Sequence, residues 1–483
     1  MPASLTQADA PVQRQQLRSG VEVQLSVPPR TGLRLEEVLD GRLGADGVRE
    51  LVHNPMQHGL ADLLAQCVPG REKLSSAKLL RTKYKPGRKL TAYYRLHVGA
   101  EVRPIALSWY AESHPDSLAA ADMQDQAAPR HLVAPFVRLT ARTDSGQMGL
   151  LIAPIDPQMP QLLRLNEHSH VASMLKSLTS DSALPAEATR IEAVRYRPGQ
   201  RHVLHVSCPP DRDGAAFIKI DRDNHGAQAV RFAEAVGPLL SEHSPNTNLV
   251  TPLGYTVEDQ AAVWRGIAGT TISEEVRDPA QAAWLFSLIG KAVRVIHDLD
   301  YQTTTYDMTA SQLSMPHLAR TELASTLGAG EHLTALMPAL GARYRLLAME
   351  VLERLEYLPE EELRLAHGDL KCDNILTSED RIWLLDLDRT GLAEPAMDLG
   401  KLLADLRWWG QHYSVDVAGL VRKFLEGYGT CDPARISRAR LIAVLYQLKL
   451  AARRTAVHAP DWGTQVTRQV GEAAASLRGE TTP

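Results

Sequence analysis

The sequence predicts an α+β protein in which two β-rich segments precede a long helical segment. Strand patterns separated by turn residues occur before residue 270, whereas helical periodicity dominates from Pro279 onwards. Strands and helices therefore segregate along the chain, which is typical of α+β folds and not of alternating parallel α/β folds. The length of 483 residues exceeds one ordinary core and predicts two or three domains.

We divide the chain into four regions. In the first domain, a helical pattern over Leu33–Leu64 leads into a block of strand patterns. A second β-rich segment follows, with a helix expected over Gly226–Leu240, and the remainder is helical apart from the loop-and-strand segment Leu365–Thr390. The predicted boundaries are 1–30 for a polar tail, 31–180 for the first domain, 185–268 for the second β-rich lobe and 269–475 for the helical lobe.

A short hairpin pattern occurs twice. Residues Lys83–Lys89 (KYKPGRK) and Arg195–Arg201 (RYRPGQR) share Tyr, Pro and Gly at equivalent positions, and a third strand follows each of them. We interpret the pair as a duplicated small β-sheet domain; two unrelated hairpins with the same Pro-Gly turn are the alternative. Lys219 in the second copy aligns with Leu107 in the first, so the first copy is interpreted as a non-catalytic cap or a degenerate lobe.

Composition excludes several classes of function. The formal net charge of −4 and the pI of about 6.5 give no general reason to bind nucleic acid or an anionic membrane. No apolar run approaches the ~20 residues of a membrane helix, and Met1–Gln16 lacks the apolar core of a signal peptide. Four scattered cysteines favour reduced thiols, so we expect a cytoplasmic protein of undetermined oligomeric state.

The strongest motif is His367–Asn374, which reads H-G-D-L-K-C-D-N. Its H-x-D-x-x-x-x-N spacing is that of catalytic loops that transfer the γ-phosphoryl group of ATP. Asp369 would accept the proton of the attacking hydroxyl, and Asn374 would hold Mg²⁺. Asp386, at the end of a short apolar strand pattern, is the expected second metal ligand.

The loop and the residues that follow it resemble the aminoglycoside phosphotransferase and choline kinase family, which has the protein-kinase-like fold. The motif H-G-D-(x)4-N is followed by Leu385–Asp388, by a short loop, and by Asp398 at a helix start. The resemblance covers about residues 190–430. It implies a small β-rich N-lobe and a larger α-rich C-lobe, preceded here by an additional α+β domain.

The resemblance also implies ATP and Mg²⁺ as cofactors and assigns further residues. Lys219 would contact the α- and β-phosphates, and the adenine-binding hinge would lie near Trp264, Gly266 and Ile267. A helix glutamate normally orients the lysine. Glu234 is the candidate for this role, with Gln228 as the second possibility.

Several polar residues near the motifs receive structural interpretations. His367 is expected to brace the loop, and Asp398 to act as an N-cap or loop brace. Asp373 and Asp388 are expected to be solvated or loop-capping, with contact to metal or substrate as the alternative. Arg197 and Arg201 are expected at a solvated hairpin tip, with phosphate binding as the alternative; these assignments rest on the motif spacing.

The sequence thus predicts an ATP- and Mg²⁺-dependent phosphotransferase acting on a hydroxyl of a small molecule, such as a sugar, an aminoglycoside or an amino alcohol. The alternative is a nucleotide-binding pseudokinase or regulatory protein. A protein kinase is disfavoured because no A-P-E segment follows Asp386. The acidic run between Glu350 and Glu362 is interpreted as a solvated helix face and does not identify the acceptor.

Overall fold

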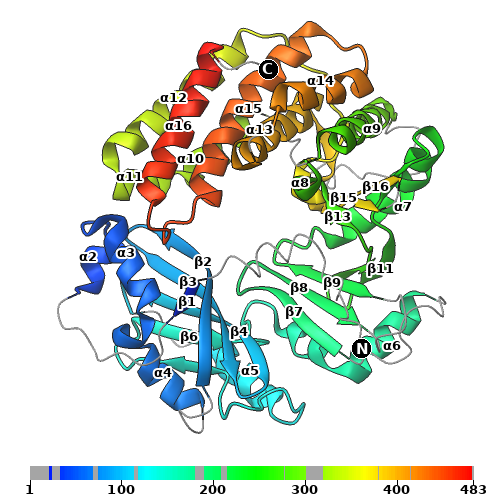
Figure 1. Cartoon of the computed structure of the whole chain (residues 1–483). Helices are drawn as coiled ribbons and strands as arrows, with labels where there is room; N and C mark the ends of the chain where they lie inside the picture. Colours follow the sequence, from blue (N-terminus) through cyan, green and yellow to red (C-terminus); the bar gives the residue numbers. More distant parts are fainter. Residues whose placement is uncertain are drawn as a thin grey trace, which may run out of the picture.

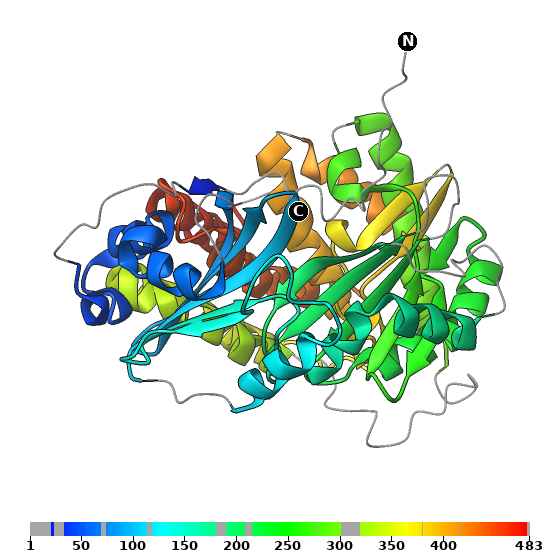
Figure 2. The same cartoon turned by 90° about the horizontal axis from the view of Figure 1, so that it is seen from below.

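The computed structural model describes residues 21–23, 33–68, 74–113, 118–179, 190–207, 215–276, 278–300, 319–378, 380–413 and 415–480. Figure 1 shows a helical lobe above two β-sheets, and Figure 2 shows the same sheets side by side from below. The strands of both large sheets come before residue 270 and most of the helices come after it, which confirms the predicted α+β class.

The first domain is built on a six-stranded sheet with the order β1-β2-β3-β4-β6-β5. Its first strand, β1 (Val21–Val23), pairs with β2 and comes from the predicted tail, of which the other residues lie outside the described ones. The remaining elements are β2 (Leu74–Lys85), β3 (Lys89–Val98), β4 (Glu101–Tyr110), β5 (Thr140–Arg142), β6 (Met148–Ile152), α2 (Leu35–Leu39), α3 (Gly44–His53), a 3-10 turn (Pro55–His58), α4 (Leu60–Cys67) and α5 (Leu118–Ala127).

The second sheet has five strands in the order β11-β12-β9-β8-β7. Both copies of the hairpin motif turn in the same way, since Lys85 pairs with Lys89 in the first and Arg197 with Arg201 in the second. The turn glycines, Gly87 and Gly199, have φ values of 65° and 70°, which explains why both copies need glycine there. The strands are β7 (Arg190–Arg197), β8 (Arg201–Ser207), β9 (Ala216–Asp221), β11 (Pro252–Thr256) and β12 (Ala261–Arg265).

The outer face of the second sheet is covered by the segment that precedes it in the chain. This segment holds 3-10 turns at Pro160–Leu162 and Arg164–Asn166 and the helix α6 (His168–Leu178). Its apolar side chains share one buried cluster with Ile218 and Val263 of the sheet. Packing thus places α6 with the second sheet, whereas the predicted boundary near residue 180 assigned it to the first domain.

A buried carboxylate joins this preceding segment to the hairpin of the second sheet. Asp156 accepts hydrogen bonds from the backbone N–H of Gly199 at 2.8 Å and from Nε2 of His202 at 2.7 Å. The Tyr196 hydroxyl donates to the carbonyl of Ile155 at 2.5 Å. Asp156 and His202 are each only 1% exposed, so these bonds replace water and hold the hairpin turn in place.

The helical lobe begins after α7 (Gly226–His243), which packs beside the second sheet. A small four-stranded sheet with the order β10-β16-β15-β13 and a pair formed by β14 and β17 carry the motif segment. The strands are β10 (Thr247–Leu249), β13 (Thr270–Thr271), β14 (Arg364–Ala366), β15 (Ile375–Ser378), β16 (Arg381–Leu384) and β17 (Gly391–Ala393).

Long helices form the rest of this lobe. None of the helices in the described part of the chain has both the length and the apolar character needed to cross a membrane. The helices are α8 (Ile272–Glu275), α9 (Pro279–Asp298), α10 (Ala319–Ala329), α11 (Glu331–Leu336), α12 (Pro338–Glu356), α13 (Pro395–Tyr413), α14 (Val417–Tyr428), α15 (Pro433–Arg454) and α16 (Trp462–Arg478).

The first domain also contacts the end of α15 and the turn that follows it. Nδ1 of His458 lies 3.0 Å from the hydroxyl of Thr82 on β2, and the His458 ring lies against the ring of His53. Arg49 donates to the carbonyl of Pro460 at 2.7 Å. Burial and the neighbouring His53 lower the pKa of His458 to about 4, so this interface is built around neutral imidazoles.

We predict that Asp156→Ala destabilises the protein by about 2–3 kcal/mol, because the buried His202 ring and the half-buried N–H of Gly199 lose their carboxylate acceptor. Chemical denaturation of the full chain measures the change. Asp144→Ala, at an exposed position in the first domain, is the matched control and should stay within about 0.5 kcal/mol of wild type. Equal stability of the two variants would contradict the assignment.

We predict acid destabilisation through His458. Its pKa is about 4 in the fold and about 6.5 unfolded, so the unfolded chain binds more protons between these values. Stability is therefore lost as pH falls from about 6.5 to about 4, by at most about 3 kcal/mol. His458→Gln should flatten the melting temperature against pH in this window. The exposed control His243→Gln should keep the wild-type slope, and an identical slope in both variants would refute the assignment.

Candidate active site

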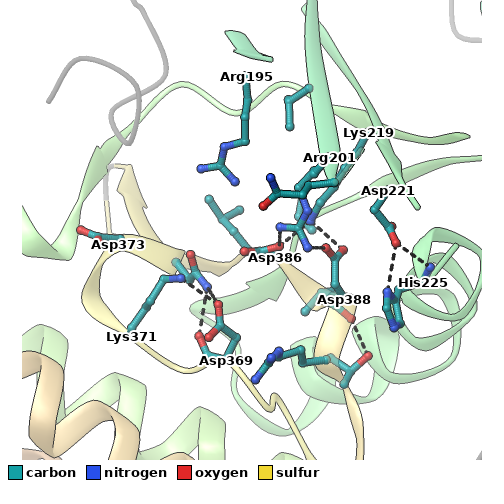
Figure 3. Close-up of a pocket in the computed structure, with 18 of the residues that line it drawn as sticks. Arg195, Arg201, Lys219, Asp221, His225, Asp369, Lys371, Asp373, Asp386 and Asp388 are labelled. Atoms are coloured by element: carbon teal, nitrogen blue, oxygen red, sulfur yellow. Dashed lines mark hydrogen bonds and ion pairs between the residues drawn. The ribbon is translucent and has the colours of Figure 1, made fainter. Parts of the chain in front are cut away.

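A cavity of about 1140 Å³ lies where the second sheet faces the motif segment of the helical lobe. Its walls include Lys219 of β9, Asp369 and Asp386 of the motif segment, and Arg81 of the first domain. Figure 3 shows the side chains of Arg195, Arg201 and Lys219 descending from the strands towards Asp386 and Asp388. All three parts of the chain thus contribute to one cavity.

The catalytic loop begins where β14 ends, and its backbone is held by Asp398. This carboxylate accepts hydrogen bonds from the backbone N–H of His367 at 2.7 Å and of Gly368 at 2.8 Å. Burial disfavours its ionisation, but a hydrogen bond from His297 and nearby positive charge hold the pKa of Asp398 below its usual range. The bracing roles predicted for Asp398 and His367 agree with this geometry, because Nδ1 of His367 lies 3.2 Å from the Asp369 N–H.

Gly368 is required by the loop conformation. Its φ is +73°, and a Cβ at this position would lie 2.0 Å from the carbonyl oxygen of Arg389. That contact is with backbone, which has no rotamer to change, so a larger residue would displace the loop. The glycine of the H-G-D motif thus allows the loop to approach the chain that follows Asp388.

Asp369 is held ionised by two lysines. Lys371 Nζ lies 2.7 Å from one carboxylate oxygen, and Lys401 of α13 contacts the other. The amide nitrogen of Asn374 donates to the same carboxylate at 2.9 Å. Burial alone would raise the pKa of Asp369, but Lys371 and Lys401 together lower it well below its usual range. Asp369 is therefore a charged hydrogen-bond acceptor in the cavity.

A second ionic cluster joins the two lobes. Lys219 contacts Asp386 and lies 2.6 Å from Asp388, while Arg201 lies 2.5 Å from Asp388 and 3.6 Å from Asp386. Burial opposes the ionisation of both carboxylates; Lys219 nevertheless lowers the pKa of Asp386, whereas burial dominates at Asp388 and raises its pKa. Asp388 is 7% exposed and ion-paired, so its predicted solvated or capping role is wrong.

The structure corrects two other predicted assignments. Glu234 is exposed on α7 and is not a partner of Lys219, which contacts Asp386 and Asp388 instead. Gln228 lines the cavity, but its amide donates to the carbonyl of Thr390 at 2.8 Å. Six residues separate these two positions, and a helix rotates by about two-thirds of a turn over that distance, which directs Glu234 away from the cavity.

The hairpin tip is also not solvated, since Arg197 and Arg201 both line the cavity. Asp373 pairs with Arg454 at 2.9 Å, so it too is not simply solvated. The burial of the hairpin tip and the pairing of Asp373 both depend on tertiary packing, which a single sequence does not show. The partners of Arg201 and Asp373 come from the motif segment and from α15, far apart from them in the sequence.

One end of the cavity is apolar. Trp264 and Ile267, predicted at the hinge, line it together with Phe217 and Leu385. Gly266 is not part of this lining; its N–H donates to the carbonyl of Ala215 at 2.7 Å. A Cβ at Gly266 would lie 2.8 Å from that carbonyl oxygen, so the glycine permits a close backbone contact beside the cavity.

The predicted metal ligands fit a hard divalent cation chemically. Asn374 and Asp386 line the same cavity, and the Asn374 amide nitrogen is used by Asp369, which leaves its oxygen for a cation. Among the described residues, no group of three His, Cys, Asp or Glu side chains is arranged to hold a metal by itself. Mg²⁺ usually takes one or two protein oxygens together with phosphates and water, so the donor set suits it.

Sequence reasoning missed several charged residues of the site. Lys371 lies inside the recognised motif, where its position two residues after Asp369 was the available signal. Lys401 lies one turn after Asp398 on α13 and gave no separate signal. Arg81 belongs to a different domain and enters the site only through packing.

The lysine strand, the braced H-G-D loop and the acidic strand end define a two-lobed phosphotransferase of the protein-kinase-like fold. Residues 210–441 match the model of APH, the phosphotransferase enzyme family. This finding confirms the predicted family resemblance and the general reaction class.

Several solved structures are similar to this chain. One is choline kinase from Cryptosporidium parvum Iowa II, with a TM-score of 0.45 and 9% identity over 64% of this chain and 95% of that one. Another is the GDP complex of wild-type aminoglycoside 2'-phosphotransferase-IIIa, with a TM-score of 0.44 and 15% identity over 65% of this chain and 100% of that one. A third is a choline/ethanolamine kinase family protein from Mesorhizobium loti, with a TM-score of 0.43 and 16% identity over 64% of this chain and 94% of that one. A comparison with curated proteins finds no match.

We predict that Gly368→Ala lowers phosphotransferase turnover by about 10²-fold, because the Cβ would push the catalytic loop from the Arg389 carbonyl. Gly87→Ala is the matched control: its φ is +65°, but no atom lies within 4 Å of the added Cβ. The control should show only the left-handed strain of about 1–2 kcal/mol in stability, with turnover unchanged. Similar turnover in both variants would show that the close contact is unimportant.

Proposed function

We propose that the protein is an ATP- and Mg²⁺-dependent kinase that phosphorylates a hydroxyl group of a small molecule. The observation that carries the proposal is the ionised Asp369 in a cavity that also holds Lys219, Asn374 and Asp386. These are the residue types that phosphoryl transfer requires for a base, for phosphate contact and for a cation. The pseudokinase alternative leaves this complete set without a role.

The apolar end of the cavity supports nucleotide binding. Side chains such as Phe217, Trp264 and Leu385 provide a surface for a purine ring. Lys219 follows Phe217 by two residues on β9 and contacts Asp386, so it would contact the α- and β-phosphates. Asn374 and Asp386 would hold Mg²⁺, which when bound neutralises charge on the phosphate oxygens.

In the proposed reaction, the acceptor hydroxyl oxygen forms a bond to the γ-phosphorus, and the bond from that phosphorus to the β,γ-bridging oxygen breaks. The hydroxyl proton passes to the Asp369 carboxylate, and ADP leaves. Lys371 and Lys401 lie beside Asp369 and place positive charge where the transferred group carries negative charge. Positioning and charge stabilisation supply most of the rate enhancement in this type of reaction.

We predict that Asp369→Asn lowers acceptor-dependent ADP release by about 10²–10⁴-fold while ATP binding is retained, because the variant loses the base but keeps the apolar end and Lys219. Steady-state ADP release and equilibrium ATP binding test the two parts separately. Asp380→Asn, at an exposed position between β15 and β16, is the control and should retain wild-type turnover. ATP binding by the wild type without turnover on any acceptor would favour the pseudokinase.

A further inference from the structure

The cavity carries an excess of positive charge. Its lining includes thirteen Lys and Arg residues and six Asp residues, an excess of seven positive charges, whereas the whole chain has a net charge of −4. A nucleotide triphosphate neutralised by a divalent cation carries much less negative charge than this excess. Part of the positive charge is therefore available to another ligand.

Five of the positive charges belong to arginines that form no ion pair within the described residues, which we call the arginine cluster: Arg81, Arg195, Arg197, Arg389 and Arg453. The other basic groups near the motif are paired: Lys219 and Arg201 with Asp386 and Asp388, and Lys371 and Lys401 with Asp369. Among the described residues no ion pair joins a carboxylate to the arginine cluster, although Asp386 and Glu322 act on Arg195 and Arg453 from a longer distance.

The arginine cluster is crowded as well as unpaired. Burial and the charges of Arg81, Arg195 and Arg201 lower the pKa of Arg197, and burial with the charges of Arg195 and Arg453 lowers the pKa of Arg81. Guanidinium groups remain protonated in proteins at ordinary pH. The lowered values therefore express burial first and repulsion within the cluster second, and a bound anion would relieve both.

The arginine cluster extends to the side of the cavity where the acceptor must approach Asp369. Arg453 follows Tyr446 and Lys449 along one face of α15, since all three line the cavity at helical spacing. Lys401, which contacts Asp369, lies 4.9 Å from the centroid of the Tyr446 ring. The Arg389 carbonyl lies against Gly368 of the catalytic loop.

Resting on the proposed kinase function, we propose that the acceptor is an anionic hydroxyl compound, a sugar or polyol that carries a phosphate or carboxylate group. The arginine cluster would bind this group, because guanidinium forks pair with both oxyanions in a bidentate manner. Arg81 gives the first domain a direct part in acceptor recognition. A cationic acceptor such as an aminoglycoside or amino alcohol would meet an unpaired wall of like charge.

The test compares matched acceptors with the full chain, ATP and Mg²⁺. Glucose 6-phosphate and glucuronate represent the phosphate and carboxylate classes, glucose is the neutral counterpart, and glucosamine and kanamycin are cationic. We expect kcat/KM for an anionic acceptor to exceed that for its neutral counterpart by at least about 10-fold. A neutral or cationic compound as the best acceptor would overturn the proposal.

Variants locate the effect. Arg81→Met and Arg453→Met should each raise KM for the anionic acceptor by about 10- to 100-fold, with KM for ATP within about twofold of wild type. Arg440→Met is the matched control, because Arg440 lies on α15, is exposed and does not line the cavity. If the two variants raised KM for ATP and left KM for the acceptor unchanged, the cluster would serve the nucleotide and the proposal would fail.

A binding measurement separates this proposal from the kinase proposal. Without nucleotide, glucose 6-phosphate should raise the melting temperature of the wild type above its value in sodium chloride of equal ionic strength. The double variant Arg81→Met, Arg453→Met should not show this increase. Such binding without ADP release would support the anion site and contradict the kinase function. ADP release with neutral acceptors and no anion-dependent stabilisation would support the kinase and overturn the anion site.

Discussion

The structure depends on the ion pairs that join the two lobes across the cavity. Lys219 and Arg201 come from the second sheet, and Asp386 and Asp388 come from the motif segment of the helical lobe. Removing one partner of a buried pair leaves an uncompensated charge, which typically costs about 3–5 kcal/mol. The pairs therefore align the lysine strand with the catalytic loop.

The first domain supports this arrangement from both sides. Lys83 donates to Gln200 at the hairpin turn of the second sheet at 3.0 Å, and Thr82 contacts His458 beyond the end of α15. Arg81, the residue before Thr82 on the same strand, lines the cavity. The domain predicted as a cap is thus fastened to the hairpin and to the helical lobe, and it supplies charge to the site that it borders.

Sequence patterns predicted the α+β class, the strand-turn-strand units and the residues of the contiguous motif. Asp369, Asn374 and Asp386 could be predicted because they lie on one loop and at the end of one strand, so their spacing in the sequence determines how they come together. The assignment of Glu234 as the partner of Lys219 was wrong because the register of a helix relative to a sheet depends on packing that a single sequence does not reveal. Arg81 and Arg453 were missed because they come from a different domain and from a late helix.

The central claim is direct transfer of the γ-phosphoryl group to a small-molecule hydroxyl with Asp369 as the base. The most direct measurement follows ³²P from the γ-position of ATP and separates acceptor, inorganic phosphate and protein. We expect wild-type protein to place the label on the hydroxyl of an anionic acceptor, and Asp369→Asn to leave it on ATP. Label recovered only as inorganic phosphate, or equal transfer by the variant, would contradict the role given to this cavity.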